Sequence, residues 1–426
     1  MNKRTKTALR RWCLYGWTLA KWTMAASAIG VVCGLIGTMF HFGVHEVTAF
    51  RGTHPWVLYL LPLAGFVIVS FYKLTEMDGL GTDDIIDAVH EGKRLPILLL
   101  PAIFFGTVLT HLCGGSAGRE GAALQMGGTI GQCMGRTFRL DDRDLRVATL
   151  AGMAAFFSAL FGTPLAATVF AIMVISIGVL YHVALYPSLL AALVAYGVSV
   201  RLGVEPTRFT VAVPDQSVGM FVRVAALGVL CALVSILFCK LMHGAGHLMK
   251  RIKNPWLRVI CGGFAVIALT WVFGTDYNGA GMDIVTRAIE QETVAVPWAF
   301  LLKLVFTAVT LAAGFKGGEV VPSFFVGATF GCAVSPLLGL PVGFGAAIGL
   351  AAVFCGVTNC PVASTLLAVE LFGAEGMLYF ALACCLSYML SGYQGLYSSQ
   401  TILYSKLKAQ FINVHTNAYH AGEKTE

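Results

Sequence analysis

The sequence is short of charged residues. Of its 426 residues, 57% are hydrophobic and 12% are Asp, Glu, Lys or Arg, whereas soluble proteins carry roughly 25% charged residues. Apolar runs recur along nearly the whole chain, which excludes a soluble protein and predicts a polytopic membrane protein surrounded by the lipid bilayer. The net charge of +7 comes from basic residues in short flanks between apolar runs, so we expect no nucleic-acid partner.

Motifs for catalysis and for cofactor binding are also lacking. The chain has no Gly-x-Ser-x-Gly element and no phosphate-binding lysine loop. Its twelve cysteines are scattered without the paired spacing of zinc sites. His243 and His247 lie four residues apart, but no acidic or cysteine partner accompanies them. We therefore expect no metal, no cofactor and no enzymatic activity.

The N-terminus is strongly basic. Five of the first eleven residues are Lys or Arg, and the positive-inside rule places such an end in the cytoplasm. No small-residue cleavage site follows that would indicate a removed signal peptide. We expect a multi-pass protein of the cell membrane, whose short polar tail leaves no room for a regulatory domain. The predicted segments are a cytoplasmic N-terminal segment 1–22, a first membrane repeat 23–200, a linker 201–220, a second membrane repeat 221–407 and a polar tail 408–426.

The two halves of the chain repeat each other. A shift of 200 residues superposes glycines 114, 118, 127 and 131 on glycines 314, 318, 327 and 331. A shift of 197 residues aligns Gly152 and Pro164 with Gly349 and Pro361. Duplicated halves with broken helices at matching positions indicate a transport site between the repeats. Several apolar runs are shorter than the roughly 20 residues of a full span, so we expect re-entrant helices; the shift alone leaves the relative orientation of the repeats open.

Three glycine-rich breaks are candidates for this site. They read Gly79-Leu-Gly-Thr-Asp-Asp, Gly118-Arg-Glu-Gly-Ala and Gly317-Gly-Glu-Val-Val-Pro. An unwound backbone that leads into a helix start offers free amides and a positive dipole end to an anion. Each break alone could serve only a close helix crossing. Together, with charges at 119, 120, 316 and 319 in apolar surroundings, they favour a binding site in which Glu120 is a gate or proton carrier.

The same residues resemble a known family. The chain is similar to the chloride-channel (CLC) family of anion channels and proton-coupled exchangers at 118–121, at 317–328 and at Leu396-Tyr-Ser-Ser. The match extends from about residue 24 to residue 407. The resemblance implies an all-α fold of two inverted repeats of tilted and broken helices. It also implies a homodimer with one pore per subunit, and a halide anion and a proton as the transported partners.

The resemblance assigns roles to individual positions. Glu120 matches the gating glutamate that carries the proton, and Arg119 matches its basic neighbour. The anion-binding positions that it implies are Leu80, Gly81, Arg119, Gly121, Val320, Val321 and Tyr397, the last as the inner-gate tyrosine.

Departures from the chloride pattern point to one branch. Leu80 replaces the serine that contacts the anion in chloride-type members, and Ala122 replaces a proline. These departures and Gly-Phe-Lys-Gly-Gly-Glu-Val (314–320) resemble the fluoride/proton exchangers, although Val321 stands where that branch commonly has a threonine. Fluoride is therefore favoured and chloride remains possible.

The departures also change the chemistry of the site. Since Leu80 offers no hydroxyl donor, the site depends on backbone amides, Tyr397 and aromatic edges such as Phe324. Glu319 is either a second acid near the site or a partner for Lys316 or Arg119.

The sequence does not decide by which route protons reach Glu120. Chloride/proton members carry an internal glutamate after the Pro-Leu-Ala helix, where this chain has Met173 and Val174. Either protons reach Glu120 through water, or the protein is the alternative, a passive chloride channel of the voltage-gated type.

Overall fold

The computed structural model describes residues 3–293, 296–408 and 410–417, with side chains from residue 11 onward. This part of the chain forms sixteen α-helices, two short 3-10 helices (Pro55–Leu60 and His182–Ala184) and one small sheet. The first half contains α1 (Lys3–Thr53), α2 (Leu61–Leu74), α3 (Thr82–Glu91), α4 (Leu99–Leu112), α5 (Glu120–Thr137), α6 (Asp142–Phe161), α7 (Pro164–Met173) and α8 (Leu185–Arg201). The second half contains α9 (Val218–Met249), α10 (Pro255–Phe273), α11 (Met282–Glu290), α12 (Ala299–Ala313), α13 (Val320–Leu338), α14 (Val342–Thr358), α15 (Pro361–Phe372) and α16 (Met377–Leu390).

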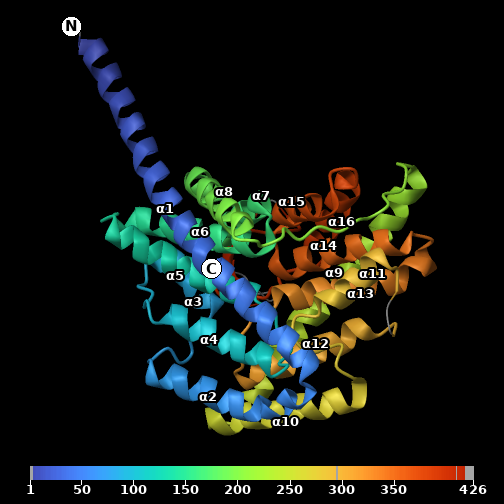
Figure 1. Ribbon diagram of the computed structural model, residues 1–426. Coiled ribbons are helices and arrows are strands. Elements are labelled where there is room, and N and C mark those ends of the chain that lie inside the picture. Colours follow the sequence, from blue (N-terminus) through green and yellow to red (C-terminus); the bar gives the residue numbers. More distant parts are fainter. Residues whose placement is uncertain (1–2, 294–295, 409, 418–426) are drawn as a thin grey trace.

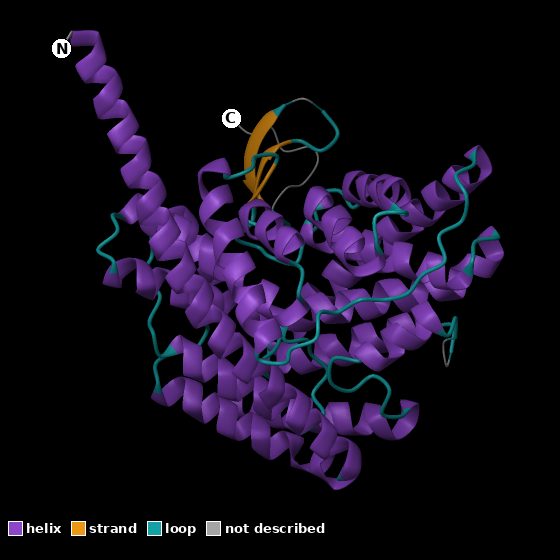
Figure 2. Cartoon of the chain, turned by 45° about the horizontal axis from the view of Figure 1, so that its top comes forward, coloured by secondary structure: helices purple, strands orange, loops and turns teal. Residues whose placement is uncertain are grey.

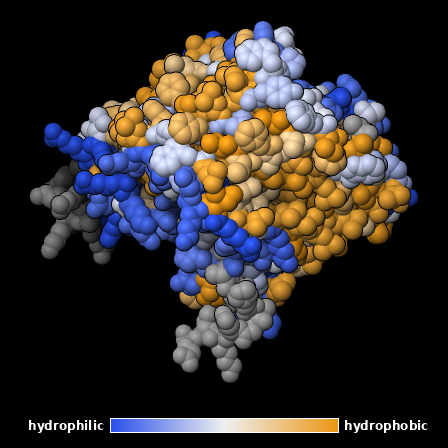
Figure 3. All heavy atoms as spheres, turned by 90° about the horizontal axis from the view of Figure 1, so that it is seen from below, coloured by the Kyte–Doolittle hydropathy of each residue, from blue (hydrophilic) through white to orange (hydrophobic). Residues whose placement is uncertain are grey.

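The helices are those of a membrane protein. Seven helical stretches of the described residues are long and apolar enough to cross a membrane, and six shorter apolar helices have 10–17 residues. Figure 3 shows a broad hydrophobic surface with hydrophilic residues gathered along one side. The predicted helical membrane fold with short, broken helices is confirmed.

Equivalent helices pack against each other in the two halves, α5 against α6 and α13 against α14 (Figure 1). A Cβ added at Gly127 on α5 would lie 2.3 Å from the carbonyl oxygen of Gly152 on α6. A Cβ added at Gly327 on α13 would lie 2.3 Å from the carbonyl oxygen of Gly349 on α14. These distances leave no room for a side chain, so each pair of helices packs backbone on backbone. The aligned glycines therefore exist because the repeats share this close crossing.

The breaks after α6 and α14 also correspond. Gly162 follows the last residue of α6 and Asn359 follows the last residue of α14, with φ angles of 69° and 60°. Both residues adopt the left-handed backbone conformation, which causes the least strain at glycine and asparagine. Pro164 and Pro361 then begin α7 and α15, as expected for a residue that lacks an amide hydrogen.

A long segment without helix, residues 202–217, joins the halves and crosses the molecule in Figure 1. It is held by backbone hydrogen bonds to each half. The Thr207 amide donates to the Phe161 carbonyl at 3.0 Å, and the Phe209 amide donates to the Leu371 carbonyl at 2.9 Å.

The sheet is an exception to the all-α prediction. β1 (Ser176–Ile177) pairs in parallel with β2 (Thr401–Tyr404), and β2 pairs antiparallel with β3 (Phe411–His415). Figure 2 shows the strands at the edge of the helical body, near the C-terminal end. The sheet fastens the end of the chain to the segment after α7, so it links the two halves again.

Candidate functional site

The second and third glycine breaks contact each other directly. The Gly118 amide donates to the Gly318 carbonyl at 2.7 Å, and the Gly318 amide donates to the Gly118 carbonyl at 2.8 Å. The two residues form an antiparallel bridge. The two glycines are 200 positions apart and are therefore equivalent residues of the two repeats. Each donates to the other the same hydrogen bond that it accepts. A local two-fold axis between inverted repeats produces this pattern.

Side chains next to the bridge follow the same symmetry. The Ser116 amide donates to the Thr310 hydroxyl at 3.1 Å, and the Lys316 amide donates to the Thr110 hydroxyl at 3.2 Å. Both threonines are fully buried. Each break is therefore held by the helix that precedes the other break.

Two helix starts meet at this bridge. α5 begins at Glu120 and α13 begins at Val320, each two residues after a bridging glycine. A Cβ added at Gly121 would lie 2.8 Å from the Gly318 Cα, so the two backbones are in contact. The first amides of a helix have no acceptor within it, and they carry the positive end of its dipole. This convergence favours an anion.

Glu120 occupies the start of α5. Its exposed fraction is 0%. Its Oε2 accepts a hydrogen bond from the Arg119 amide at 2.9 Å, and its Oε1 lies 3.4 Å from the Arg119 Nε. Oε1 makes no hydrogen bond within the described residues. The carboxylate thus takes the position that suits an anion, with Oε1 in an ion pair with Arg119 but without a hydrogen bond within the described residues.

A cavity of about 450 Å³ adjoins Glu120. We call it the Glu120 cavity. Its walls come from both halves of the chain and include His41, His45, Arg119, Glu120, Asp283 and Val321. One guanidinium, two imidazoles and one carboxylate, that of Asp283, therefore border the gate position.

Arg119 is fixed on two sides. Its NH1 lies 3.0 Å from Nδ1 of His41 on α1, while its Nε faces Glu120. Because a guanidinium can only donate, His41 accepts at Nδ1 and its imidazole is neutral in this arrangement. The bond joins α1 to the gate across 78 positions of sequence.

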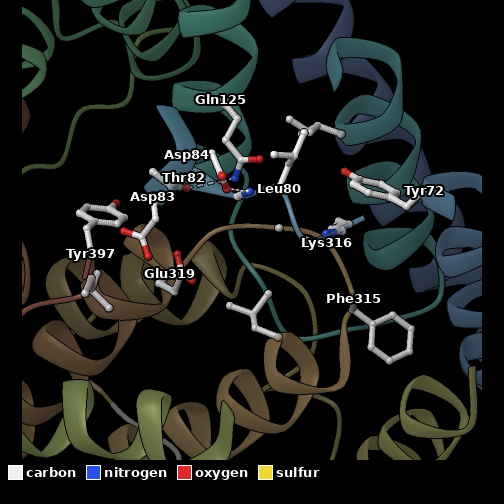
Figure 4. A pocket seen from close by; sticks show the side chains of 16 residues that line it. Tyr72, Leu80, Thr82, Asp83, Asp84, Gln125, Phe315, Lys316, Glu319 and Tyr397 are labelled. Carbon is white, nitrogen blue, oxygen red and sulfur yellow. Dashed lines mark hydrogen bonds between the residues drawn. The ribbon is translucent and has the colours of Figure 1, made fainter. Parts of the chain in front are cut away.

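A second cavity, of about 300 Å³, is lined by the first and third breaks. We call it the Tyr397 cavity, and Figure 4 shows Leu80, Asp83, Lys316, Glu319 and Tyr397 around it. Among the described residues, the two cavities share no lining residue.

The starts of α5 and α13 separate the two cavities. On α5, Glu120 lines the Glu120 cavity and Gln125 lines the Tyr397 cavity. At the start of α13, Val321 lines the Glu120 cavity and Glu319 lines the Tyr397 cavity. An ion that passes from one cavity to the other must pass these helix starts.

In the first glycine break, a carboxylate of the protein itself already binds a backbone amide. The Gly81 amide donates to the Asp84 carboxylate at 2.8 Å, and Leu80 presents an apolar side chain to the Tyr397 cavity. An external anion at Gly81 would therefore compete with Asp84 for this amide.

Tyr397 is held by its neighbours in sequence. The Ser399 amide donates to the Asp83 carboxylate at 3.1 Å. The Gln400 side-chain amide donates to the carbonyls of Val174 and Thr358 at 2.9 and 3.0 Å. The buried hydroxyl of Tyr397 has no hydrogen-bond partner within the described residues, so it is free to donate to an anion.

Glu319 lines the Tyr397 cavity. Within the described part of the chain it forms an ion pair with neither Lys316 nor Arg119. Of the two alternatives from the sequence, the geometry fits an acid beside the site better than a charge partner.

Phe324 lies elsewhere. It packs edge-on against Phe161 and Phe354, with ring centroids 5.7 and 5.1 Å away. It belongs to the lining of neither cavity. The suggestion that its edge faces the anion finds no support in this arrangement.

The sequence reasoning missed His41 and Lys303. Lys303 on α12 is fully buried, and its ammonium donates to the carbonyls of Tyr277 and Gly279 at 3.1 and 2.6 Å. Both residues interrupt apolar runs, and an ionisable residue inside a membrane helix is by default paired or functional. That signal was available in the sequence, but the partners were not.

Comparisons with known proteins agree with this architecture. Residues 63–392 match the voltage gated chloride channel family. The chain is 39% identical over 400 residues to a chloride/fluoride channel protein of Pseudomonas syringae pv. tomato, with 91% of this chain and 88% of that protein covered. An H(+)/Cl(-) exchange transporter, ClcA of Vibrio vulnificus, is 25% identical, with 87% of this chain and 86% of that protein covered.

Solved structures show the same fold. A crystal structure of a CLC-type fluoride/proton antiporter superposes with a TM-score of 0.88 at 32% identity, and the match covers 91% of this chain and 99% of that one. A cyanobacterial Cl-/H+ antiporter superposes with a TM-score of 0.75 at 19% identity, covering 87% of this chain and 94% of that one.

Proposed function

The chain belongs to the voltage gated chloride channel family, and we propose that it exchanges halide anions for protons across the membrane. One observation carries the proposal. The Glu120 carboxylate is buried at the meeting point of two helix starts, with one oxygen free of hydrogen bonds within the described residues. It therefore competes with a transported anion for the same positive position.

Protonation of Glu120 couples the two ions. As an anion, the carboxylate is stabilised at the α5 start and excludes a halide from it. Once protonated, it loses this attraction and leaves the position to the halide. The return of the carboxylate after deprotonation then drives the halide onward, so each movement of the gate carries one proton.

The Tyr397 cavity supplies the inner route. Met173 and Val174 occupy the positions where chloride/proton exchangers have an internal glutamate, so the proton must reach Glu120 by another path. We propose that Glu319 accepts protons from the inner side and that Tyr397 is the inner gate. Both residues line the same cavity, which is large enough to hold several waters.

Fluoride is the favoured substrate. Support comes from the chloride/fluoride channel protein at 39% identity and from the fluoride/proton antiporter structure with its TM-score of 0.88. Leu80 gives no hydroxyl to the anion, so backbone amides of α5 and α13 and the Tyr397 hydroxyl bind it. Chloride is the alternative substrate, because Val321 at the Glu120 cavity stands where the fluoride/proton exchangers commonly have a threonine.

The arrangement in the membrane is part of the proposal. The basic N-terminal segment 1–22 lies on the cytoplasmic side, repeats 23–200 and 221–407 surround the site, and 201–220 links them. The proposal includes a homodimer, as the resemblance to the family implies.

Flux from liposomes tests the proposal. Purified protein is reconstituted into vesicles loaded with sodium fluoride or sodium chloride, and halide efflux and internal pH are followed with and without a proton ionophore. Exchange predicts that outward halide flow drives proton uptake against a proton gradient. A passive channel would release halide without moving protons uphill, and equal rates for the two halides would remove the fluoride preference.

A further inference from the structure

The ammonium group of Lys316 forms no ion pair within the described residues, and the charges of Asp78 and Asp84 act on it from beyond contact distance. It lines the Tyr397 cavity. Its contact is the ring of Tyr72 on α2, whose centroid is 4.0 Å from Nζ. A cation inside a protein is costly unless an anion or several acceptors balance it.

A second donor beside it is also unpartnered. Tyr72 is 1% exposed, and its hydroxyl makes no hydrogen bond within the described residues. Buried hydroxyls nearly always have a partner. Figure 4 shows the Tyr72 hydroxyl and the Lys316 nitrogen both turned toward the space beside Leu80. Two independent donors thus face one cavity, and the buried Tyr72 hydroxyl lacks an acceptor within the described residues.

The position of Lys316 is built by the fold. A Cβ added at Gly106 on α4 would lie 3.0 Å from the Lys316 Cγ and 3.3 Å from the Tyr72 Cε2. The missing side chain therefore makes room for both groups. The Lys316 amide is fixed by the Thr110 hydroxyl at 3.2 Å, one turn further along α4. Lys316 is consequently a positioned cation and not a mobile surface lysine.

We propose that Lys316 and Tyr72 form an anion-binding subsite in the Tyr397 cavity that takes a small monovalent anion, a halide. Three carboxylates, those of Asp83, Asp84 and Glu319, line the same cavity (Figure 4), and the Asp84 carboxylate is already bound to the Gly81 amide. Their negative charge disfavours a multivalent anion, while the Lys316 ammonium holds a single charge against it. The subsite collects the halide before it reaches the helix starts of α5 and α13. It deepens the proposed halide exchange and, for its role in transport, rests on it.

Equilibrium binding tests the subsite. The full chain in detergent is titrated calorimetrically with sodium fluoride and with sodium chloride, for wild type and the variants Lys316→Met, Lys316→Arg and Tyr72→Phe. Lys73→Met is the matched control, because its ammonium also lies 4.0 Å from a ring centroid, that of Trp256, but lines neither cavity.

We expect Lys316→Met to weaken one halide site roughly tenfold or more, since hydrogen bonds to charged groups contribute about 1.5–3 kcal/mol. Tyr72→Phe weakens it several-fold. Lys73→Met binds as wild type, and Lys316→Arg, which keeps the charge, binds the halide more tightly than Lys316→Met does.

Equal halide affinity and stoichiometry in Lys316→Met and Lys73→Met overturn the inference. If Lys316→Met does not fold, as judged by gel filtration and thermal unfolding, Tyr72→Phe decides, because it removes one oxygen atom; unchanged affinity in that variant overturns the subsite. Binding is measured without transport. A protein that binds halides at Lys316 but fails to exchange them therefore contradicts the proposed function and leaves the subsite standing.

Discussion

Gly118 and Gly318 donate their backbone amides to each other's carbonyl oxygens, at 2.7 and 2.8 Å. Each glycine stands two residues before a helix start that belongs to the proposed ion path. The starts of α5 and α13 are therefore tied together, and the gate on one repeat has a fixed position relative to the anion-binding amides of the other.

This contact predicts the effect of Gly318→Ala. The added Cβ would lie 2.2 Å from the Gly121 amide nitrogen, so the two backbones must separate. Overpacking of this kind costs about 1–3 kcal/mol, and we expect a lower midpoint of thermal unfolding and loss of halide flux. Gly219→Ala, with nothing within 4 Å of its Cβ, is the control. A Gly318→Ala protein with wild-type unfolding and flux would show that the contact is dispensable.

Val321→Thr tests the substrate preference. Val321 lines the Glu120 cavity, and threonine adds a hydroxyl donor at nearly the same volume. Fluoride, being small, gains more from a direct donor than chloride does, so we expect the ratio of fluoride to chloride efflux rates to rise several-fold. Val321→Ala changes the volume without adding a donor and should leave the ratio unchanged. An equal rise in both variants would assign the effect to space instead of hydrogen bonding.

Glu370→Ala tests the contact between α7 and α15. The Glu370 carboxylate on α15 accepts hydrogen bonds from the Leu165 and Ala166 amides at 3.1 and 2.8 Å, in the first turn of α7. Its removal leaves two helix-start amides without this acceptor, so we expect the free energy of unfolding to fall by about 1–3 kcal/mol. Denaturant unfolding measures the change, and Glu375→Ala, at an exposed position, is the control. Equal stability of the two variants would contradict a capping role.

Lys406 makes the docking of the C-terminal sheet depend on pH. The residue lies between β2 and β3 and donates to the Asn359 side chain, the Tyr388 carbonyl and the Ser391 hydroxyl. Burial lowers the pKa of its ammonium to about 7, from an ordinary value of 10.5. Between these two values the unfolded segment binds more protons than the folded one, so the stability of the docked segment rises with pH. Below pH 7 both forms are protonated and the dependence ends.

Amide hydrogen exchange in Thr401–Tyr404, corrected for the intrinsic rate at each pH, measures this dependence. Protection should increase from about pH 7 to pH 10 in the wild type and in Lys408→Met, where the residue is exposed. It should stay level in Lys406→Met. An identical pH profile in all three proteins would remove Lys406 as the cause.

Much of the architecture was readable from the sequence, because backbone contact leaves a compositional trace. The glycines at 127, 152, 327 and 349 recur in both halves since no other residue fits those helix crossings. The break at Gly118 was readable for the same reason, whereas Glu120 was readable as a charge in apolar surroundings.

The sequence did not reveal that the site has two separate cavities. Glu319 and Val321 are two residues apart, yet they line different cavities, and only the relative placement of α5 and α13 decides which. The Arg119–His41 hydrogen bond joins residues 78 positions apart, and the sequence around either residue gives no indication of it. The sheet was missed because β1 has two residues, too few for a periodic pattern.

Proton pumping by Glu120→Gln tests the central claim most directly. The variant and the control Glu375→Gln are reconstituted into vesicles loaded with sodium fluoride, and uptake of protons driven by outward fluoride flow is recorded. We predict that Glu120→Gln loses this uptake while Glu375→Gln keeps it, because glutamine fills the same position but cannot carry the proton. Proton uptake by Glu120→Gln at the wild-type rate would contradict the assignment of Glu120 as gate and proton carrier.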